Sequence, residues 1–305
     1  MKTVFKKHFF RNPVFFLEVS RVIYKISKAV IPQQIFQNIV LESNFMQNFQ
    51  FKDTDILFNE KRALERVIKS KIVNTLEYKS CNEIGLNIYP YIYFLNRILK
   101  EPRFLPNLVF FVSKGYKLSK LERFEKKALN GQYEKYKKKI IELEGKILGY
   151  PRCCINSFIE SKFSDVSAET RLIIECYENG LFEDLLKAFE KSEIVPYYAF
   201  FTSNFYPCSI DCKRAKRIGK RLDKHLKEYS NAFRLRTMIN LFYYLVIAYK
   251  MYKYDEKYKN LFKGLFSKIG NSWLEVFEKS ERSIVNLTDF TNTFILRVLN
   301  KNQKD

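Results

Sequence analysis

The chain has 305 residues, of which 47% are hydrophobic and 16% aromatic, and this composition excludes an intrinsically disordered protein. Lysine and arginine outnumber aspartate and glutamate by 54 to 33, which gives a formal net charge of +21. So large an excess favours a polyanionic partner, nucleic acid before an acidic membrane surface. A lysine-rich proteome in which every protein is basic would explain the charge equally well.

Helical periodicity dominates the first third of the chain. A proline at the first turn and apolar residues at helical spacing predict a helix that starts at Pro13 and ends before Pro32. Amphipathic helices are also expected at 55–72 and 91–100. The run 108–112 is β-branched and aromatic and lies between a proline and a glycine, which is typical of a buried strand.

The rest of the chain is also predicted to be mostly helical. The pattern over 118–147 is interrupted at Asn130-Gly131, a strong turn signal, and the aromatic segment 197–202 could form a second short strand. Further helices are expected at 168–180, 181–192, 211–228, 231–254, 261–269, 273–279 and 290–299. The expected fold is therefore mainly α, a multi-helix globular protein with at most a few short β-strands.

Domain boundaries are weakly marked. The turn at Asn130-Gly131 suggests an N-terminal helical region at 1–130, a cysteine-motif domain at 131–230 and a C-terminal helical region at 231–305, although one continuous domain fits equally well. No secretory signal is recognisable, and the longest apolar run is too short to cross a bilayer. We therefore expect no transmembrane segment and a cytoplasmic protein, in which thiols stay reduced.

Four of the six cysteines fall in two tight clusters. The first is Gly149-Tyr150-Pro151-Arg152-Cys153-Cys154, and the second is Pro207-Cys208-Ser209-Ile210-Asp211-Cys212. Cys81 and Cys176 are isolated in amphipathic surroundings, as small buried cysteines usually are. Two pairs that each stand beside a proline predict one thiolate site for a metal, with Cys153, Cys154, Cys208 and Cys212 as ligands.

Each cluster also has the features of a helix start. Pro151 suits the first position of a helix, which puts Cys153 and Cys154 in its opening turn. In the second cluster Ser209 is expected to cap a helix, with Asp211 in its first turn. Because helix N-termini lower the pKa of thiols, both starts favour metal-binding thiolates. The residues expected to shape the site are Tyr150, Pro151, Pro207, Ser209 and Asp211.

The spacing leaves the metal open between an iron–sulfur cluster and zinc. Adjacent cysteines in a helix point about 100° apart, so one zinc ion is expected to bind both only where the backbone departs from helical geometry. A wider iron–sulfur cluster accepts splayed ligands more easily and is slightly favoured. Against it, the cysteine spacing of ferredoxins is absent, and Cys-x3-Cys lies within the range of cysteine spacings found in structural zinc sites. Redox-active thiols without a metal, and unconnected structural cysteines, are the alternatives.

The two clusters and their flanks resemble a known family. The string from Leu148 to Cys154, with Phe158, and the string from Phe205 to Cys212, with Ala215 and Gly219, are similar to the Gly-Tyr-Pro-x-Cys-Cys and Pro-Cys-x-x-x-Cys motifs of an uncharacterised, largely archaeal domain family of unknown function. The resemblance covers roughly 148–222. It implies that the two clusters belong to one site, and it implies no reaction.

A cationic helix is predicted directly after Cys212. Ala215, Ile218, Leu222 and Leu226 recur at helical spacing and form its buried stripe. The other positions are almost all cationic, whereas a helix that needs only solubility usually mixes both signs. Such a face suits nucleic acid, a phosphorylated substrate or the anionic cluster itself, and a solvated face is the ordinary alternative. The candidate anion-binding residues are Lys213, Arg214, Arg217, Lys220 and Arg221.

Absent motifs narrow the function further. There is no glycine-rich phosphate loop and no nucleophile elbow, and the two histidines, His8 and His225, have no convincing catalytic partner. Histidine-rich metal chemistry is thereby excluded. Whether the chain is an enzyme stays open. The first expectation is a metal-binding protein, such as an RNA-modifying or other nucleic-acid-associated enzyme. The alternatives are a non-enzymatic nucleic-acid-binding module with a structural metal, and a metal-free thiol redox protein.

Overall fold

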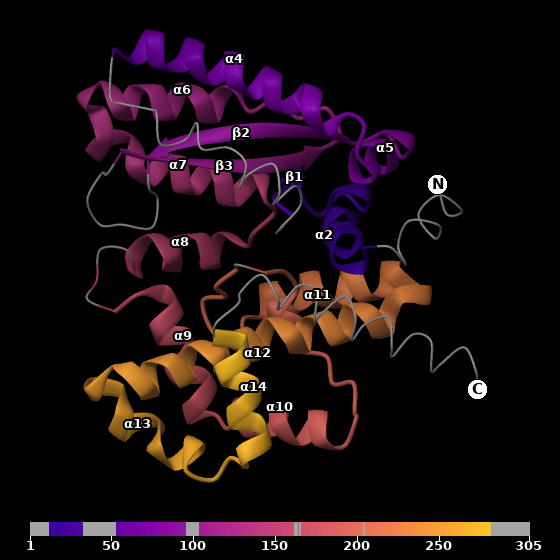
Figure 1. Cartoon of the computed structure of the whole chain (residues 1–305), viewed down its shortest axis with the longest axis vertical. Coiled ribbons are helices and arrows are strands. Elements are labelled where there is room, and N and C mark those ends of the chain that lie inside the picture. Colours follow the sequence, from indigo (N-terminus) through magenta and orange to yellow (C-terminus); the bar gives the residue numbers. More distant parts are fainter. Residues whose placement is uncertain are drawn as a thin grey trace. The chain divides into compact units, whose positions relative to one another are not determined.

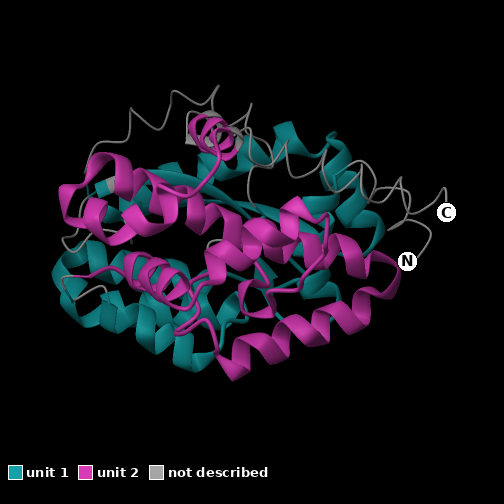
Figure 2. Ribbon diagram, turned by 90° about the horizontal axis from the view of Figure 1, so that it is seen from below, with its two compact units in different colours: residues 1–165 teal, residues 166–305 magenta. Residues whose placement is uncertain are grey.

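The computed structural model describes residues 12–32, 53–95, 104–161, 164, 166–203 and 205–281. These residues form a mainly α fold with one small three-stranded sheet, as expected (Figure 1). Contacts within the chain divide it into two compact units, residues 1–165 and residues 166–305, which Figure 2 colours teal and magenta. The three sequence-based domains stay a prediction, and the helix expected at 290–299 lies outside the described residues.

Side-chain caps fix where the helices of the first unit begin. The side chain of Asn12 accepts from the backbone of Phe15, and those of Asp53 and Thr75 cap the next two helices. The first helix stops at Ile23, well before Pro32. The described helices of this unit are α2 (Pro13–Ile23), α4 (Thr54–Ile72), α5 (Leu76–Glu83), α6 (Ser119–Lys127), α7 (Tyr133–Ile147) and α8 (Arg152–Ser161), with the π-helical turn η2 (Ala128–Gln132) between α6 and α7.

The sheet of the first unit is antiparallel, in the order β1-β3-β2. Its strands are β1 (Ala29–Val30), β2 (Asn87–Leu95) and β3 (Phe104–Ser113), so the strand expected at 108–112 is confirmed. The helix expected at 91–100 is wrong over 91–95, which lie in β2, and its remaining residues are outside the described part. Almost every residue of β2 is buried, so the strand shows no alternation of apolar and polar residues from which it could have been recognised.

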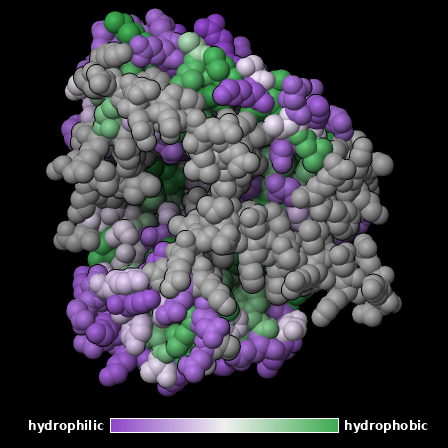
Figure 3. Space-filling view, viewed as in Figure 1, coloured by the Kyte–Doolittle hydropathy of each residue, from purple (hydrophilic) through white to green (hydrophobic). Residues whose placement is uncertain are grey.

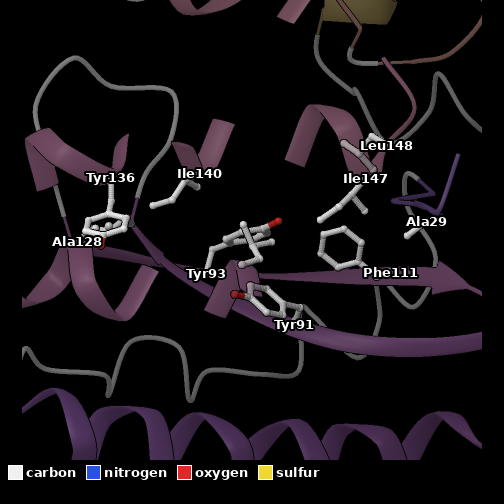
Figure 4. Packing of buried hydrophobic residues seen from close by; sticks show 11 residues of the cluster. Ala29, Tyr91, Tyr93, Phe111, Ala128, Tyr136, Ile140, Ile147 and Leu148 are labelled. Atoms are coloured by element: carbon white, nitrogen blue, oxygen red, sulfur yellow. The ribbon is translucent and has the colours of Figure 1, made fainter. Parts of the chain in front are cut away.

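The core of the first unit lies between the sheet and α7. In Figure 4 the rings of Tyr93 and Phe111 from the two long strands lie between the sheet and Ile140 and Ile147 of α7, and the ring of Tyr91 packs beside that of Tyr93. The two tyrosine rings meet edge to face, with centroids 4.7 Å apart. The sheet and α7 are therefore held together by aromatic packing, and α7 leads directly into the first cysteine cluster.

Two glutamates bind the backbone of β2 on the side away from β3. The amide of Ile92 donates to Glu65 of α4 at 2.9 Å, and the amide of Phe94 donates to Glu125 of α6 at 2.7 Å. The ammonium of Lys61, which is fully buried, lies 3.3 Å from Glu125 and 3.9 Å from Glu65. Burial raises the pKa of Glu65 to about 7, a rise that Lys61 and the amide bond partly offset.

The turn expected between α6 and α7 is confirmed. Asn130 and Gly131 depart from helical geometry inside η2, and Gly131 has a positive φ of 79°. Both residues are exposed. The turn reverses the chain, so that α6 and α7 pack against each other.

The described part of the second unit contains helices and connecting loops but no strand. Its elements are α9 (Ala168–Glu178), α10 (Leu181–Glu190), the short 3-10 helices η3 (Tyr198–Phe200) and η4 (Lys227–Tyr229), α11 (Lys213–Leu226), α12 (Ser230–Tyr254), α13 (Glu256–Phe266) and α14 (Asn271–Glu281). The strand suggested at 197–202 is wrong. Polar side chains of the buried helix α12 bind this backbone instead: Thr237 accepts from the amide of Tyr197 at 2.9 Å, and Asn240 donates to the carbonyl of Phe200 at 2.8 Å.

Most large apolar side chains of the described residues are buried. The view in Figure 3 shows hydrophilic residues over much of the described surface, with hydrophobic ones in small groups. The exposed large apolar residues are Ile56, Val67, Leu76, Val166 and Tyr254. None of the described helices combines the length and the apolar character that a membrane span requires.

Candidate metal centre

The first cysteine cluster begins where α7 ends in a Schellman turn. The amide of Gly149 donates to the carbonyl of Lys146 at 3.3 Å, and the amide of Tyr150 donates to that of Gly145 at 2.9 Å. Gly149 adopts a positive φ of 74°. The glycine of the Gly-Tyr-Pro motif is therefore required by the left-handed backbone of the turn.

The same turn is pressed against the loop that follows α2. A Cβ atom at Gly149 would lie 2.5 Å from the carbonyl oxygen of Ile26, so no other residue fits there. The guanidinium of Arg21 donates to the carbonyl of Leu148 and lies 5.6 Å from the ring centroid of Tyr150. These contacts hold the start of α8 in a defined position.

Both cysteines of the first pair lie in the opening turn of α8, as expected. The carbonyl of Pro151 accepts from the amides of Cys154 and Ile155 at 3.0 Å each, so the proline directly precedes the helix. The sulfur atoms of Cys153 and Cys154 are only 3.9 Å apart. The two sulfurs are thus close although both residues lie in the opening turn of the helix, where a separation of about 100° around the axis led us to expect divergent side chains.

A carboxylate of α9 holds the second cysteine cluster. Glu175 accepts from the hydroxyl of Ser209 at 2.6 Å and from the amide of Ile210 at 3.2 Å. The hydroxyl of Ser209 also accepts from the amide of Asp211 at 3.1 Å. The loop between the two cysteines is thus fixed by bonds to its backbone and its serine.

The helix after this loop begins later than predicted. Ser209 does not cap it, because its hydroxyl is bonded within the loop and to Glu175. Instead α11 begins at Lys213, with Cys212 in the capping position, and Asp211 lies before the helix, where it pairs with Lys216. Pro207 is buried just before the loop. Cys212 therefore sits at the positive end of the α11 dipole.

The sulfur atoms of Cys153, Cys154, Cys208 and Cys212 all lie within 4.8 Å of one another. Four thiolates on one tetrahedral ion at a Zn–S distance of about 2.3 Å would be about 3.8 Å apart. The greatest separation of the four sulfurs, 4.8 Å at most, exceeds this value by about 1 Å. Cys154 and Cys212 are buried, and Cys153 and Cys208 are partly exposed. This four-cysteine cluster could hold a metal ion.

The two isolated cysteines differ from these four. Cys81 and Cys176 are fully buried, and burial raises the pKa of the Cys81 thiol to about 12 and that of the Cys176 thiol further still. They stay protonated and act as small apolar side chains. No disulfide joins any of the six cysteines, all of which lie in the described residues.

The candidate anion-binding residues all lie on the exposed side of α11. Lys213, Arg214, Arg217, Lys220 and Arg221 are exposed, and so is His225 further along the helix. His8 lies outside the described residues. Inspection of the sequence missed Glu175 as a residue that holds the site. It precedes a buried cysteine in an ordinary amphipathic helix, and no local pattern indicates its bond to a loop more than thirty residues away.

Comparison with known proteins gives a match to one family and no activity. Residues 104–240 match the model of a family described as a protein of unknown function, DUF483. The match includes both cysteine clusters and the whole of α11. No curated protein and no solved structure matches the chain.

Proposed function

We propose that the chain is a metal-binding protein in which Cys153, Cys154, Cys208 and Cys212 hold one tetrahedral ion, Zn²⁺ before iron. The observation that carries this proposal is the closeness of the four sulfurs, all within 4.8 Å of one another. Neutral thiols have no reason to gather in this way, whereas a divalent cation stabilises four thiolates around one point. A reducing compartment, such as the cytoplasm, suits such a centre because it keeps the thiols free to bind metal.

The distances favour a single ion over an iron–sulfur cluster. In a cluster the cysteines bind different iron atoms, so their sulfurs stand farther apart than the sulfurs on one ion. The pair Cys153 and Cys154 supports the single ion most directly, because its separation of 3.9 Å is near that of two thiolates on one zinc. The slight preference for iron–sulfur that the sequence suggested is therefore not kept in this proposal.

The ligand set favours a structural role for the metal. Four thiolates complete a tetrahedral shell and leave no position for water or substrate, and an open position is what catalytic zinc sites retain. We therefore place the non-enzymatic, nucleic-acid-associated module ahead of an RNA-modifying enzyme. In a metal-free redox protein, mild oxidation would join two of the thiols in a disulfide. The sulfurs of Cys153 and Cys154, which are 3.9 Å apart, would then have to approach to about 2.05 Å.

Metal analysis of protein purified without oxygen tests the proposal. The wild-type chain should carry close to one zinc per chain, with no absorption in the visible range. Cys154→Ser and Cys212→Ser should each lower the metal content strongly, because each removes one ligand. Cys81→Ala and Cys176→Ala are the matched controls and should leave it unchanged. A wild-type protein without metal, or equal metal content in all four variants, would show the proposal to be wrong.

Removal of the metal tests its structural role. Because metal binding contributes to the folding free energy of a closed site, chelation should lower the melting temperature by many degrees. Re-addition of zinc should restore it. An apo protein that melts at the same temperature as the metal-bound form would contradict the structural role, and it would support a catalytic or redox centre instead.

A further inference from the structure

The exposed side of α11 carries positive charges that no neighbouring acidic side chain of the described residues neutralises. Its six exposed cations are Lys213, Arg214, Arg217, Lys220, Arg221 and Lys224. We refer to these six residues as the α11 cationic face. Among the described residues, none of the six has an acidic side chain within ion-pair distance. Lys216, which is less exposed, is the cation of this helix that pairs with an acid, Asp211.

The one acidic residue of α11 points inward. Asp223 is buried, and it accepts from the hydroxyls of Tyr198 and Ser230 and from Nε of Arg234 at 2.9 Å. Its charge is therefore used inside the second unit. An ordinary solvated helix looks different. On α7, Lys137 pairs with Glu134 and Lys146 pairs with Glu142.

The packing of α11 fixes which side faces outward. Gly219 lies so close to η3 that a Cβ atom there would be 2.4 Å from the carbonyl oxygen of Tyr198. Ala215, Leu222 and Leu226 are buried on the same side of the helix. A helix that binds a membrane surface lays its apolar side into the lipid, and on α11 that side is already packed against protein. The geometry thus disfavours a membrane and favours a polyanion that contacts the charges alone.

The cations form a row along the helix axis. Lys213, Arg217, Lys220 and Lys224 follow one another at intervals of three or four residues, so they lie on one side of the helix and span about 16 Å. Consecutive phosphates of a nucleic-acid strand are separated by several ångströms, so a row of this length can contact a few of them. Arginine forks, of which this face has three, bind phosphate oxygens in pairs.

We propose that the α11 cationic face binds the phosphate backbone of nucleic acid, with little dependence on base sequence. The inference deepens the proposed function by naming the partner of the module and the surface that contacts it. It requires only that α11 be folded, and the metal is not part of the contact. Phosphate contacts of this kind release counterions, so the affinity should fall steeply with salt.

Salt-dependent binding of the zinc-loaded full chain to a short labelled RNA and to duplex DNA tests the inference. The variant is the triple substitution Arg217→Gln, Lys220→Gln and Arg221→Gln. With a slope of ~0.7 per phosphate contact, loss of three contacts should lower the salt slope by ~2 and the affinity at ~0.1 M salt by ~100-fold. The matched control removes the same charge from α7, with Lys135→Gln, Lys138→Gln and Lys139→Gln, and should bind almost as well as the wild type.

Equal weakening in both triple variants would mean that net charge alone does the binding, and it would overturn the inference. So would a wild-type chain that binds neither nucleic acid at low salt, or one that binds only vesicles of anionic lipid. Metal content and melting temperature are measured on the same samples. Full metal content without nucleic-acid binding removes this inference alone, whereas binding by a protein that carries no metal removes the metal centre and leaves the inference standing.

Discussion

The two cysteine pairs are positioned in different ways, although both stand beside a proline. The first pair follows a local backbone turn, the Schellman turn at Gly149 that leads straight into α8, and this turn also packs against the loop after α2. The second pair lies on a loop that is held from a distance by Glu175 of α9. The comparison teaches that similar cysteine motifs can be supported by short-range and by long-range interactions, and only the first kind is visible in the motif itself.

The largest expected effect is at the local turn. Gly149→Ala should lower the free energy of unfolding by about 3–5 kcal/mol, because the new methyl group both requires a strained positive φ and meets the backbone of Ile26. Gly131→Ala is the matched control, since its φ is also positive but nothing lies within 4 Å. It should cost only about 1 kcal/mol. Thermal unfolding measures both variants, and equal losses would show that the close contact is unimportant.

A smaller loss is expected where α11 meets η3. Gly219→Ala keeps a helical φ, but its methyl group would meet the carbonyl of Tyr198, so we expect a loss of about 2 kcal/mol. Gly264→Ala, in α13, meets only the end of a tyrosine side chain and should be neutral or slightly stabilising. If Gly219→Ala unfolds no more easily than Gly264→Ala, then α11 is not held by this contact.

Removal of the long-range bond should affect metal affinity more than folding. Glu175→Ala frees the loop between Cys208 and Cys212, and loss of such a supporting bond typically weakens metal binding by ~10–100-fold. Glu175→Gln keeps an acceptor and should lose less. Glu178→Ala, an exposed change on the same helix, is the control. Competition with a chromophoric chelator measures the affinity, and an unchanged value in Glu175→Ala would mean that the loop holds its shape unaided.

The smallest expected effect concerns the carboxylate that binds β2 in the first unit. The folded-state pKa of Glu65, about 7, lies above its ordinary value of 4.5, so its contribution to stability is complete below pH 4.5 and is lost as the pH rises through 7. The glutamine of Glu65→Gln does not titrate, so the variant does not lose stability in this way as the pH rises. Relative to the wild type, the variant should therefore gain about 1–2 kcal/mol between pH 5 and pH 6.5.

The exposed change Glu60→Gln, also on α4, serves as the control for Glu65 and should follow the wild type at both pH values. Denaturant unfolding at each pH measures the difference. A constant gap between wild type and Glu65→Gln across this range would indicate that the pKa of Glu65 is not raised.

Much of the helical fold could be predicted from the sequence because its signals are local. The turn at Asn130-Gly131 and the proline at the start of α2 fix conformations within a few residues. The failures were at segments that depend on partners far away. Residues 91–95 form a strand because β3 pairs with them, and 197–202 form no strand because α12 binds their backbone.

The site shows the same division. That the four clustered cysteines come together was expected from their spacing and from the family resemblance, and the closeness of their sulfurs agrees. The small distance between Cys153 and Cys154 was not expected, because it depends on side-chain rotamers at the helix end. The inward direction of Asp223 could not be predicted either, since it follows from the packing of α11 against η3 and α12.

The outer side of β2 has a further consequence for the behaviour of the protein in concentrated solution. An uncovered strand edge can recruit a strand from another molecule and start aggregation. Here Pro90 has no amide hydrogen, and the next two amides on that side, those of Ile92 and Phe94, are already occupied by carboxylates. A second copy of the chain finds no free amide at Pro90, Ile92 or Phe94 with which to extend the sheet, so this stretch of the edge strand is protected from edge-to-edge association.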